Sequence, residues 1–179
     1  MINYRVTKYD PKKRNEHDQY IDGSEWREID HIGKSFYNSP TYEEYEKVET
    51  NYIEAIKLIL KDNNLDYLLV DRVSLTEKSL FKMYSKSGRL KNIKINYDKE
   101  LKTIRKGKKY VQENMERILR LILRNVIWLL LKNKNFEVRI GYDLYMYIVC
   151  DKLNDATVKK IECLGLFIEE GIKPILFID

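Results

Sequence analysis

The chain has 179 residues, of which 44% are hydrophobic and 34% charged, and its formal net charge is +5. This composition excludes a disordered chain, because the apolar residues suffice for a core, and the length favours one domain. The longest uninterrupted apolar run, residues 144–150, is far shorter than the roughly 20 residues that cross a bilayer. The first residues lack the pattern of a secretory signal, so we expect a cytoplasmic protein with no membrane contact.

The first third of the chain predicts a strand, a loop and a helix. Residues 2–9 alternate apolar and polar side chains, as in a strand with one buried face. Residues 12–35 are polar but carry aromatic and branched side chains, which predicts a structured loop that Trp26 anchors to the sheet. Thr41 and Glu44 have the spacing of a capping box, in which each side chain accepts the other's backbone amide. A helix with an apolar stripe is therefore expected to begin at this point.

The middle of the chain predicts a second strand and the longest helix. Residues 67–73 have the composition of a buried strand, and residues 76–84 that of a short helix. Residues 90–97 place apolar side chains among lysines, as in an edge strand. Residues 99–109 are mostly charged and are expected to form a turn or the entry to a helix. Residues 110–132 are apolar at helical spacing, which predicts a long central helix in the core.

The last part of the chain predicts a hairpin, a helix and a strand. Residues 136–149 contain two alternating apolar segments joined by a glycine-containing turn, as in a β-hairpin. A helix that begins near Asn154 ends at Gly165 or continues to Gly171, and residues 174–178 are expected to form a final strand.

The order of these elements predicts the fold class. No segment of 20–50 residues repeats along the chain, and no glycine-rich nucleotide-binding turn follows a strand. We therefore expect a single α+β domain over residues 1–179, with a mixed or antiparallel sheet flanked by helices and one long central helix.

Motifs of catalysis are weak in this sequence. Residues 33–35 (Gly-Lys-Ser) match the end of a phosphate-binding P-loop, but the motif requires a glycine where the chain has Glu28. His17 and His31 each adjoin an aspartate, which can orient an imidazole for acid–base chemistry, yet adjacency in sequence does not make a catalytic geometry. We therefore predict that the protein is not an enzyme.

The two cysteines, Cys150 and Cys163, lie thirteen residues apart with no CxxC spacing. This separation, without a neighbouring histidine, favours two reduced and buried thiols over a metal site or a disulfide. No metal and no other cofactor is expected.

Charge is distributed unevenly along the chain. Residues 1–71, the first block, hold 10 Lys and Arg against 15 Asp and Glu. Residues 72–139, the middle block, hold 19 against 6, and residues 140–179 hold 4 against 7. Like charges concentrated in this way oppose compaction but attract ligands of opposite charge. The segregation therefore predicts a surface that binds another macromolecule.

The middle block supports nucleic-acid binding as one interpretation. Cations interleaved with tyrosines neutralise phosphates and stack bases. The candidate nucleic-acid-binding residues are Lys102, Arg105, Lys106, Lys108 and Lys109. Internal ion pairs offer another interpretation, because Glu113 and Glu116 precede Arg117 and Arg120 by one helical turn.

The first block supports binding of a basic protein. Acidic side chains occupy the early loop and crowd the helix that follows Thr41, where those near the helix start interact favourably with the macrodipole. A partner with a positively charged cleft is steered to such a surface and held in register by it.

A resemblance connects this surface with a class of partner. The residues that carry it are 4–11 (Tyr-Arg-Val-Thr-Lys-Tyr-Asp-Pro), Arg14, Tyr20, 25–26 (Glu-Trp), 30–33 (Asp-His-Ile-Gly) and 142–148 (Tyr-Asp-Leu-Tyr-Met-Tyr-Ile). This pattern resembles small bacterial immunity proteins of toxin–immunity pairs, including contact-dependent growth-inhibition systems. The resemblance implies a non-enzymatic cytoplasmic protein that binds one cognate toxin domain and covers its active site or substrate path.

The expectation from sequence is thus an immunity protein that neutralises a toxin, with a nuclease as the expected toxin. Because contact residues vary within such families, none is transferred from the resemblance. The toxin-binding residues predicted from charge are Asp22, Glu25, Asp30, Glu46 and Glu49. The alternative remains a nucleic-acid-binding protein that uses residues 102–109.

Overall fold

The computed structural model describes residues 1–17, 19–35 and 38–172. The α-helices of this part are α1 (Tyr42–Asp62), α2 (Lys78–Lys86), α3 (Gln112–Leu123) and α4 (Asp155–Cys163). The strands are β1 (Ile2–Thr7), β2 (Tyr67–Leu75), β3 (Lys109–Val111), β4 (Ile127–Asn133), β5 (Phe136–Ile140), β6 (Met146–Cys150) and β7 (Phe167–Glu170). These elements form an α+β fold, as the sequence predicts.

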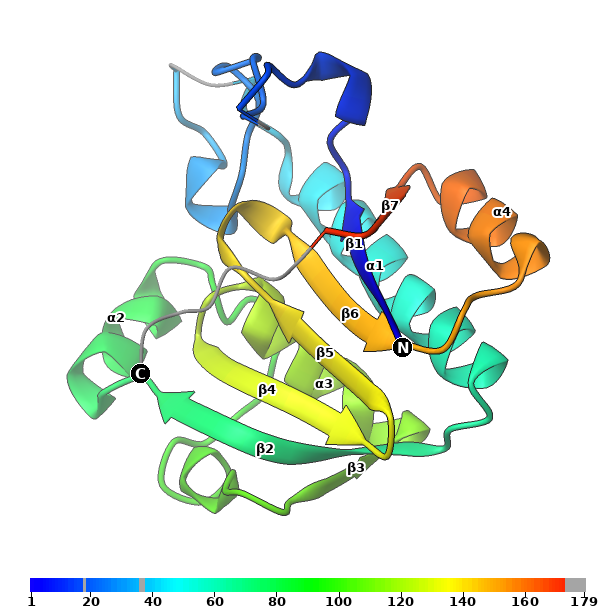
Figure 1. Ribbon diagram of the computed structural model, residues 1–179. Helices are drawn as coiled ribbons and strands as arrows, with labels where there is room; N and C mark the ends of the chain where they lie inside the picture. Colours follow the sequence, from blue (N-terminus) through cyan, green and yellow to red (C-terminus); the bar gives the residue numbers. More distant parts are fainter. Residues whose placement is uncertain (18, 36–37, 173–179) are drawn as a thin grey trace.

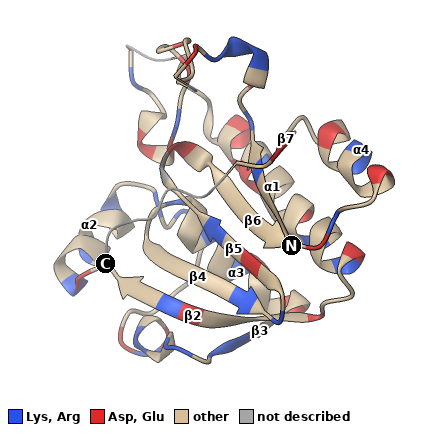
Figure 2. Ribbon diagram, in the orientation of Figure 1, with Lys and Arg blue, Asp and Glu red and all other residues tan. Residues whose placement is uncertain are grey.

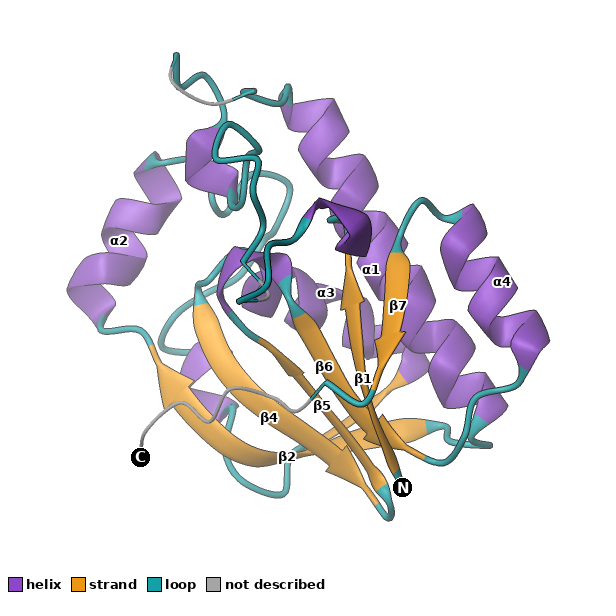
Figure 3. Ribbon diagram, turned by 45° about the horizontal axis from the view of Figure 1, so that its top comes forward, coloured by secondary structure: helices purple, strands orange, loops and turns teal. Residues whose placement is uncertain are grey.

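The seven strands form one sheet in the order β3-β2-β4-β5-β6-β1-β7. Every neighbouring pair is antiparallel. The N-terminal strand β1 lies between β6 and β7, so the two ends of the described chain meet in the sheet (Figure 1). Helices α1 and α3 lie against one face of the sheet, and α4 packs beside α1 (Figure 3).

Alternation along the central strands produces the core. In β4, Leu129 and Leu131 are buried beneath the helices, and Val138 of β5 and Ile148 of β6 continue the same layer. Successive side chains of a strand point to opposite faces, so one set enters the core. The buried apolar residues form one cluster that includes the helices α1 and α3. No helix in the described ranges is both long and apolar enough to span a membrane.

The capping box at the start of α1 is confirmed. The backbone amide of Glu44 donates to Oγ1 of Thr41 at 3.2 Å, and the amide of Thr41 donates to Oε2 of Glu44 at 2.7 Å. Both bonds satisfy amides that have no partner within the helix. Tyr52 and Ile56 lie fully buried on the apolar stripe.

The long central helix predicted over residues 110–132 is wrong. Helix α3 ends at Leu123, Asn125 adopts a left-handed conformation with φ of 54°, and the chain returns as strand β4. The apolar run from Val126 to Leu131 is compatible with a buried helix or with a central strand. Pairing with β2 on one side and β5 on the other selects the strand.

Two further expectations differ from the structure. Residues 90–97 form turns and irregular backbone instead of an edge strand. The helix near Asn154 ends just before Gly165, whose φ is +80°, which confirms the first of the two expected ends, but it does not continue to Gly171, because the unpredicted strand β7 follows it. The final strand expected over residues 174–178 lies outside the described residues.

A buried ion pair joins α1 to the end of α3. Nε of Arg124 lies 2.6 Å from Oε1 of Glu49, Nη2 lies 2.7 Å from Oε2, and both side chains are 0% exposed. Nη1 of Arg124 donates to the carbonyl of Lys91 at 2.6 Å, which fixes the segment after α2. Burial alone lowers the pKa of Arg124, but the hydrogen bonds and charge of Glu49 raise it above its ordinary value.

The substitution Glu49→Gln tests the contribution of this pair to stability. Removing one partner leaves the Arg124 charge buried without its counter-charge, so the free energy of unfolding should fall by about 3–5 kcal/mol. Chemical denaturation measures the change. Glu43→Gln, at an exposed position in the first turn of the same helix, is the matched control and should lower stability by at most about 1 kcal/mol, which is the contribution of an exposed charge to the helix macrodipole. Equal effects of both substitutions would contradict a structural role for Glu49.

Candidate functional site

The acidic residues predicted to bind a toxin do not form one free surface. Glu49 cannot belong to it, because its carboxylate is buried between Arg120 and Arg124. Asp30 is partly exposed, but its oxygens accept hydrogen bonds from Arg89, with Nε–Oδ1 at 3.0 Å and Nη2–Oδ2 at 2.6 Å. The assignment of Glu49 to a contact surface is therefore corrected, and much of the charge of Asp30 is neutralised within the chain.

The other three acidic residues stay partly exposed. Glu25 forms an ion pair with Lys8, and Oε1 of Glu46 lies 4.0 Å from Nη2 of Arg124. Asp22 accepts hydrogen bonds from the backbone amide and hydroxyl of Ser24, which lower its pKa. Asp22, Glu25 and Glu46 can still reach a partner from the molecular surface.

Charges that are separated in sequence meet in the folded chain. The pairs of Glu49 with Arg124 and of Asp30 with Arg89 join the first block to the middle block. On the sheet, Nζ of Lys132 lies 3.3 Å from a carboxylate oxygen of Asp71. Figure 2 shows basic and acidic residues next to one another on the strands. Part of the charge segregation therefore serves internal pairing.

The N-terminal segment is fastened to α1 by aromatic contacts. Trp26 is 9% exposed, and its ring centroid lies 5.6 Å from that of Tyr45 on α1. Nζ of Lys8 lies 3.8 Å from the Trp26 ring centroid, and the backbone amide of Lys8 donates to the hydroxyl of Tyr52 at 2.8 Å. Trp26 thus anchors the loop as expected, but its ring packs against helix α1 and not against the sheet. Burial lowers the pKa of Lys8 to about 8, and the carboxylate of Glu25 opposes this shift.

A groove of about 580 Å³ follows from this arrangement. It lies between the N-terminal segment, the first turns of α1 and the turn after α4, and we call it the N-terminal groove. Its lining includes the side chains of Trp26, Val48, Leu164, Glu25, Glu44 and Lys47. A lining that combines apolar surface with two carboxylates suits an inserted side chain that has an aliphatic stem and a positive end.

The basic residues of the alternative interpretation all lie exposed on one loop and the start of edge strand β3. They are Lys102, Arg105, Lys106, Lys108 and Lys109, and we call residues 102–109 the basic loop. Nζ of Lys102 lies 3.1 Å from Oδ1 of Asp98, and Nζ of Lys109 lies 4.0 Å from the Tyr67 ring centroid. Within the described ranges, Arg105 and Lys108 have no carboxylate partner. The structure therefore brings this whole predicted set together.

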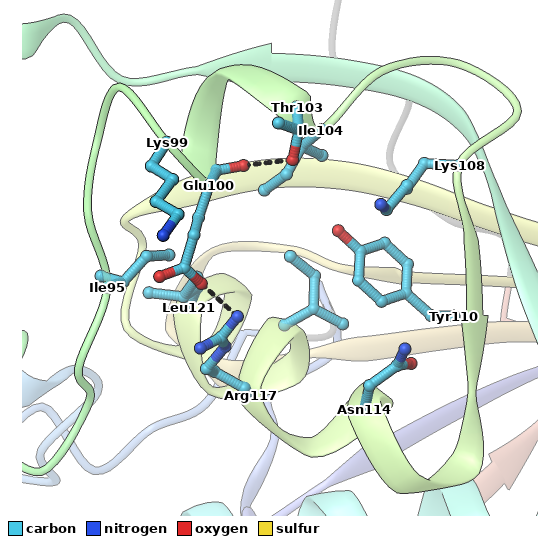
Figure 4. A pocket seen from close by; sticks show the side chains of 11 residues that line it. Ile95, Lys99, Glu100, Thr103, Ile104, Lys108, Tyr110, Asn114, Arg117 and Leu121 are labelled. Atoms are coloured by element: carbon cyan, nitrogen blue, oxygen red, sulfur yellow. Dashed lines mark hydrogen bonds and ion pairs between the residues drawn. The ribbon is translucent and has the colours of Figure 1, made fainter.

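A cavity of about 250 Å³ lies beside the basic loop, between β3, the 3-10 helix Leu101–Thr103 and α3, and we call it the β3–α3 cavity (Figure 4). Lys99, Lys108 and Arg117 supply its cations, and Tyr110 and Asn114 supply neutral hydrogen-bonding groups. Among these residues, only Lys108 belongs to the nucleic-acid-binding set predicted from the sequence. Asn114 and Arg117 share a face of α3 by their spacing of three residues, but no sequence spacing signals that Lys99, Lys108 and Tyr110 meet them.

The two histidines lie in different environments. His31 is partly buried, its Nδ1 accepts a hydrogen bond from the backbone amide of Arg27 at 3.1 Å, and burial lowers its pKa. Nε2 of His17 lies 3.5 Å from Oε1 of Glu16 on an exposed turn. Asp18, the expected neighbour of His17, lies outside the described residues.

The cysteines occupy different environments. Cys150 is buried, and burial raises the pKa of its thiol to about 12. Cys163 is exposed at the end of α4, so the expectation of two buried thiols is wrong for this residue. Among the residues that the structure describes, no three His, Cys, Asp or Glu side chains are placed to hold a metal ion.

Comparison with known proteins finds no matching family model, no similar curated protein and no similar solved structure. The functional assignment therefore depends on the residues and surfaces described above.

The buried Lys8 should make stability depend on pH. Its pKa is about 8 in the folded chain against an ordinary value of 10.5, so the unfolded chain binds more protons between these values. The contribution of Lys8 to stability should therefore rise with pH in this window, by about 2 kcal/mol between about pH 7.5 and 9.5, while the raised pKa of the Cys150 thiol lowers stability in both proteins near the upper end. Denaturant titrations of the wild type and Lys8→Met measure the difference, and the variant should lack the rise. The same slope in both proteins would contradict the assignment.

Proposed function

We propose that this chain is an immunity protein that binds a cognate bacterial toxin domain and covers its active site or substrate path. The expected toxin is a basic protein, with a nuclease as the leading class. The protein acts in the cytoplasm of the producing cell by stoichiometric binding, without a cofactor and without catalysing a reaction.

The N-terminal groove is the observation that carries this proposal. Residues 4–11 and 25–26, which carry the resemblance to immunity proteins, belong to the segment that α1 holds in place through Trp26 and Tyr45. The same segment supplies Glu25 and Trp26 to the lining of the groove. The part of the chain with the family pattern is thus also a part that presents a recessed, partly acidic surface.

The geometry of the groove suits recognition of a protein. A large aromatic side chain in a recess is typical of the few residues that dominate interface energy. Carboxylates around such a recess raise the association rate with a cationic partner and fix its orientation, more than they add affinity. Because Trp26 and Val48 are held by α1, the groove exists before binding and needs little ordering when a partner arrives.

The double substitution Asp22→Asn with Glu44→Gln tests the acidic surface. Both replacements keep an oxygen that accepts the present hydrogen bonds, from Ser24 and from the Thr41 amide, while they remove two charges. The dissociation constant for a toxin domain encoded beside this chain should rise about tenfold, mainly through a slower association rate. Its dependence on salt should also become flatter, because the attraction that salt screens is reduced. Association and dissociation rates, measured with one partner immobilised on a surface at several salt concentrations, report both effects.

Glu162→Gln on α4 is the matched control, because Glu162 is exposed and does not line the groove. It should leave the association rate unchanged within about twofold. If the double variant binds the toxin as the wild type does, this surface is not the binding site. If the wild type binds no neighbouring toxin domain, the proposed function itself is rejected.

Nucleic-acid binding is the second candidate function, and the exposed basic loop favours it. Five cations within eight residues lie in solvent at one sheet edge, and Lys106 is 81% exposed at its side chain. Such a cluster neutralises backbone phosphates and releases counterions, so binding to nucleic acid would weaken steeply as salt increases.

A further inference from the structure

We propose that the β3–α3 cavity binds a terminal phosphomonoester group of a single-stranded nucleic acid, while the basic loop beside it contacts the following backbone phosphates. This inference rests on the second candidate function and is independent of toxin binding through the N-terminal groove.

The charge of the cavity carries the first step. Its lining holds three cations, Lys99, Lys108 and Arg117, and one carboxylate, Glu100, which gives a net charge of +2. Glu100 forms an ion pair with Arg117. Lys99 and Lys108 have no carboxylate partner in the described part of the chain, so their charges remain for a ligand. A phosphomonoester carries about −1.5 to −2 at neutral pH, whereas a carboxylate or a phosphodiester carries one negative charge.

The hydrogen-bonding groups agree with the same ligand. In Figure 4 the hydroxyl of Tyr110 points into the cavity from β3, the ammonium of Lys108 points into it from the loop just before β3, and Asn114 lines it from α3. Tyr110 is 9% exposed, and burial raises its pKa, so its hydroxyl keeps a proton to donate. Donors from several directions match the three terminal oxygens of a phosphomonoester better than the two oxygens of a carboxylate.

The size of the cavity restricts the ligand to an end group. Its volume of about 250 Å³ lies below the roughly 300–1,000 Å³ of pockets that enclose a whole small molecule. Ile104, Ile118 and Leu121 form its apolar part, and apolar side chains give no reward for burying a second charged group. A terminal phosphate can enter the cavity while the rest of the strand stays outside it.

The basic loop extends the site beyond the cavity. Lys108 lines the cavity, and Arg105, Lys106 and Lys109 lie exposed beside it on the same loop and strand. The regularly spaced phosphates of a nucleic-acid backbone can contact successive cations of this loop. Scattered carboxylates on a protein surface offer no such repeat, which is why nucleic acid is favoured here over an acidic protein partner.

Fluorescence anisotropy with single-stranded oligonucleotides of about eight nucleotides tests the inference. One RNA sequence and its DNA counterpart are each prepared with a 5′-phosphate, with a 3′-phosphate and with hydroxyl groups at both ends, with the label at an internal base. At least one oligonucleotide with a terminal phosphate should bind about tenfold more tightly than its hydroxyl-ended counterpart. Inorganic phosphate and an acidic peptide serve as competitors.

Substitutions locate the preference. Lys108→Gln removes a solvent-accessible charge from the cavity lining. The ratio between the dissociation constants of the hydroxyl-ended and the phosphate-ended oligonucleotide should then fall from about ten to about two or less. Lys99→Gln should reduce it in the same direction. Lys160→Gln on α4, an exposed lysine far from β3, is the matched control and should retain the full preference (Figure 1). None of the three side chains is buried, so each variant should fold like the wild type. Circular dichroism melts check that it does.

The outcomes separate this inference from the function on which it rests. Salt-sensitive binding with no preference for a terminal phosphate would overturn the inference and leave nucleic-acid binding standing. No binding of any oligonucleotide at low salt would reject both. Displacement by the acidic peptide but not by inorganic phosphate would assign the cavity to a protein partner, and a preference that persists in Lys108→Gln would place the phosphate elsewhere.

Discussion

The buried ion pair between Glu49 and Arg124 joins three parts of the chain that are distant in sequence. Glu49 belongs to α1, Arg124 follows α3, and the arginine also holds the backbone of Arg89 and Lys91. A charged group in such a place is tolerated only with its partner and its hydrogen bonds, since an isolated buried charge costs several kcal/mol. The pair therefore ties the helical layer, and the segment after α2, to a single arrangement.

That constraint determines which charges remain for function. Asp30 and Glu49 form ion pairs with arginines of the same chain, so their charges are not available to attract a binding partner. Two carboxylates that remain near the surface, Glu25 and Glu44, line the N-terminal groove, where Trp26 provides apolar contact. Arg105 and Lys108 on the basic loop and Lys99 in the β3–α3 cavity have no carboxylate partner within the described residues. Two surfaces of different character result from one network of internal pairs.

The sheet keeps these two surfaces apart. Strand β3 forms one edge, and β1 and β7 lie at the other, where the turn before β7 borders the N-terminal groove. A cationic toxin at the groove and a phosphate group at the cavity would thus bind at different ends of the molecule. Exposed charges farther apart than about 8–10 Å are largely screened at physiological salt, so each surface acts on its own partner.

Local patterns in the sequence determined the capping box of α1 and the strands β1, β2, β5 and β6, because hydrogen-bond partners and alternation lie within a few residues. Only the tertiary structure decided that the run from Val126 to Leu131 is a strand, since its apolar residues fit a helix equally well until β2 and β5 pair with it. Only the fold placed Glu49 inside and gathered Lys99, Lys108 and Arg117 around one cavity. Charge can be counted along a sequence, but which charges meet depends on contacts between distant segments.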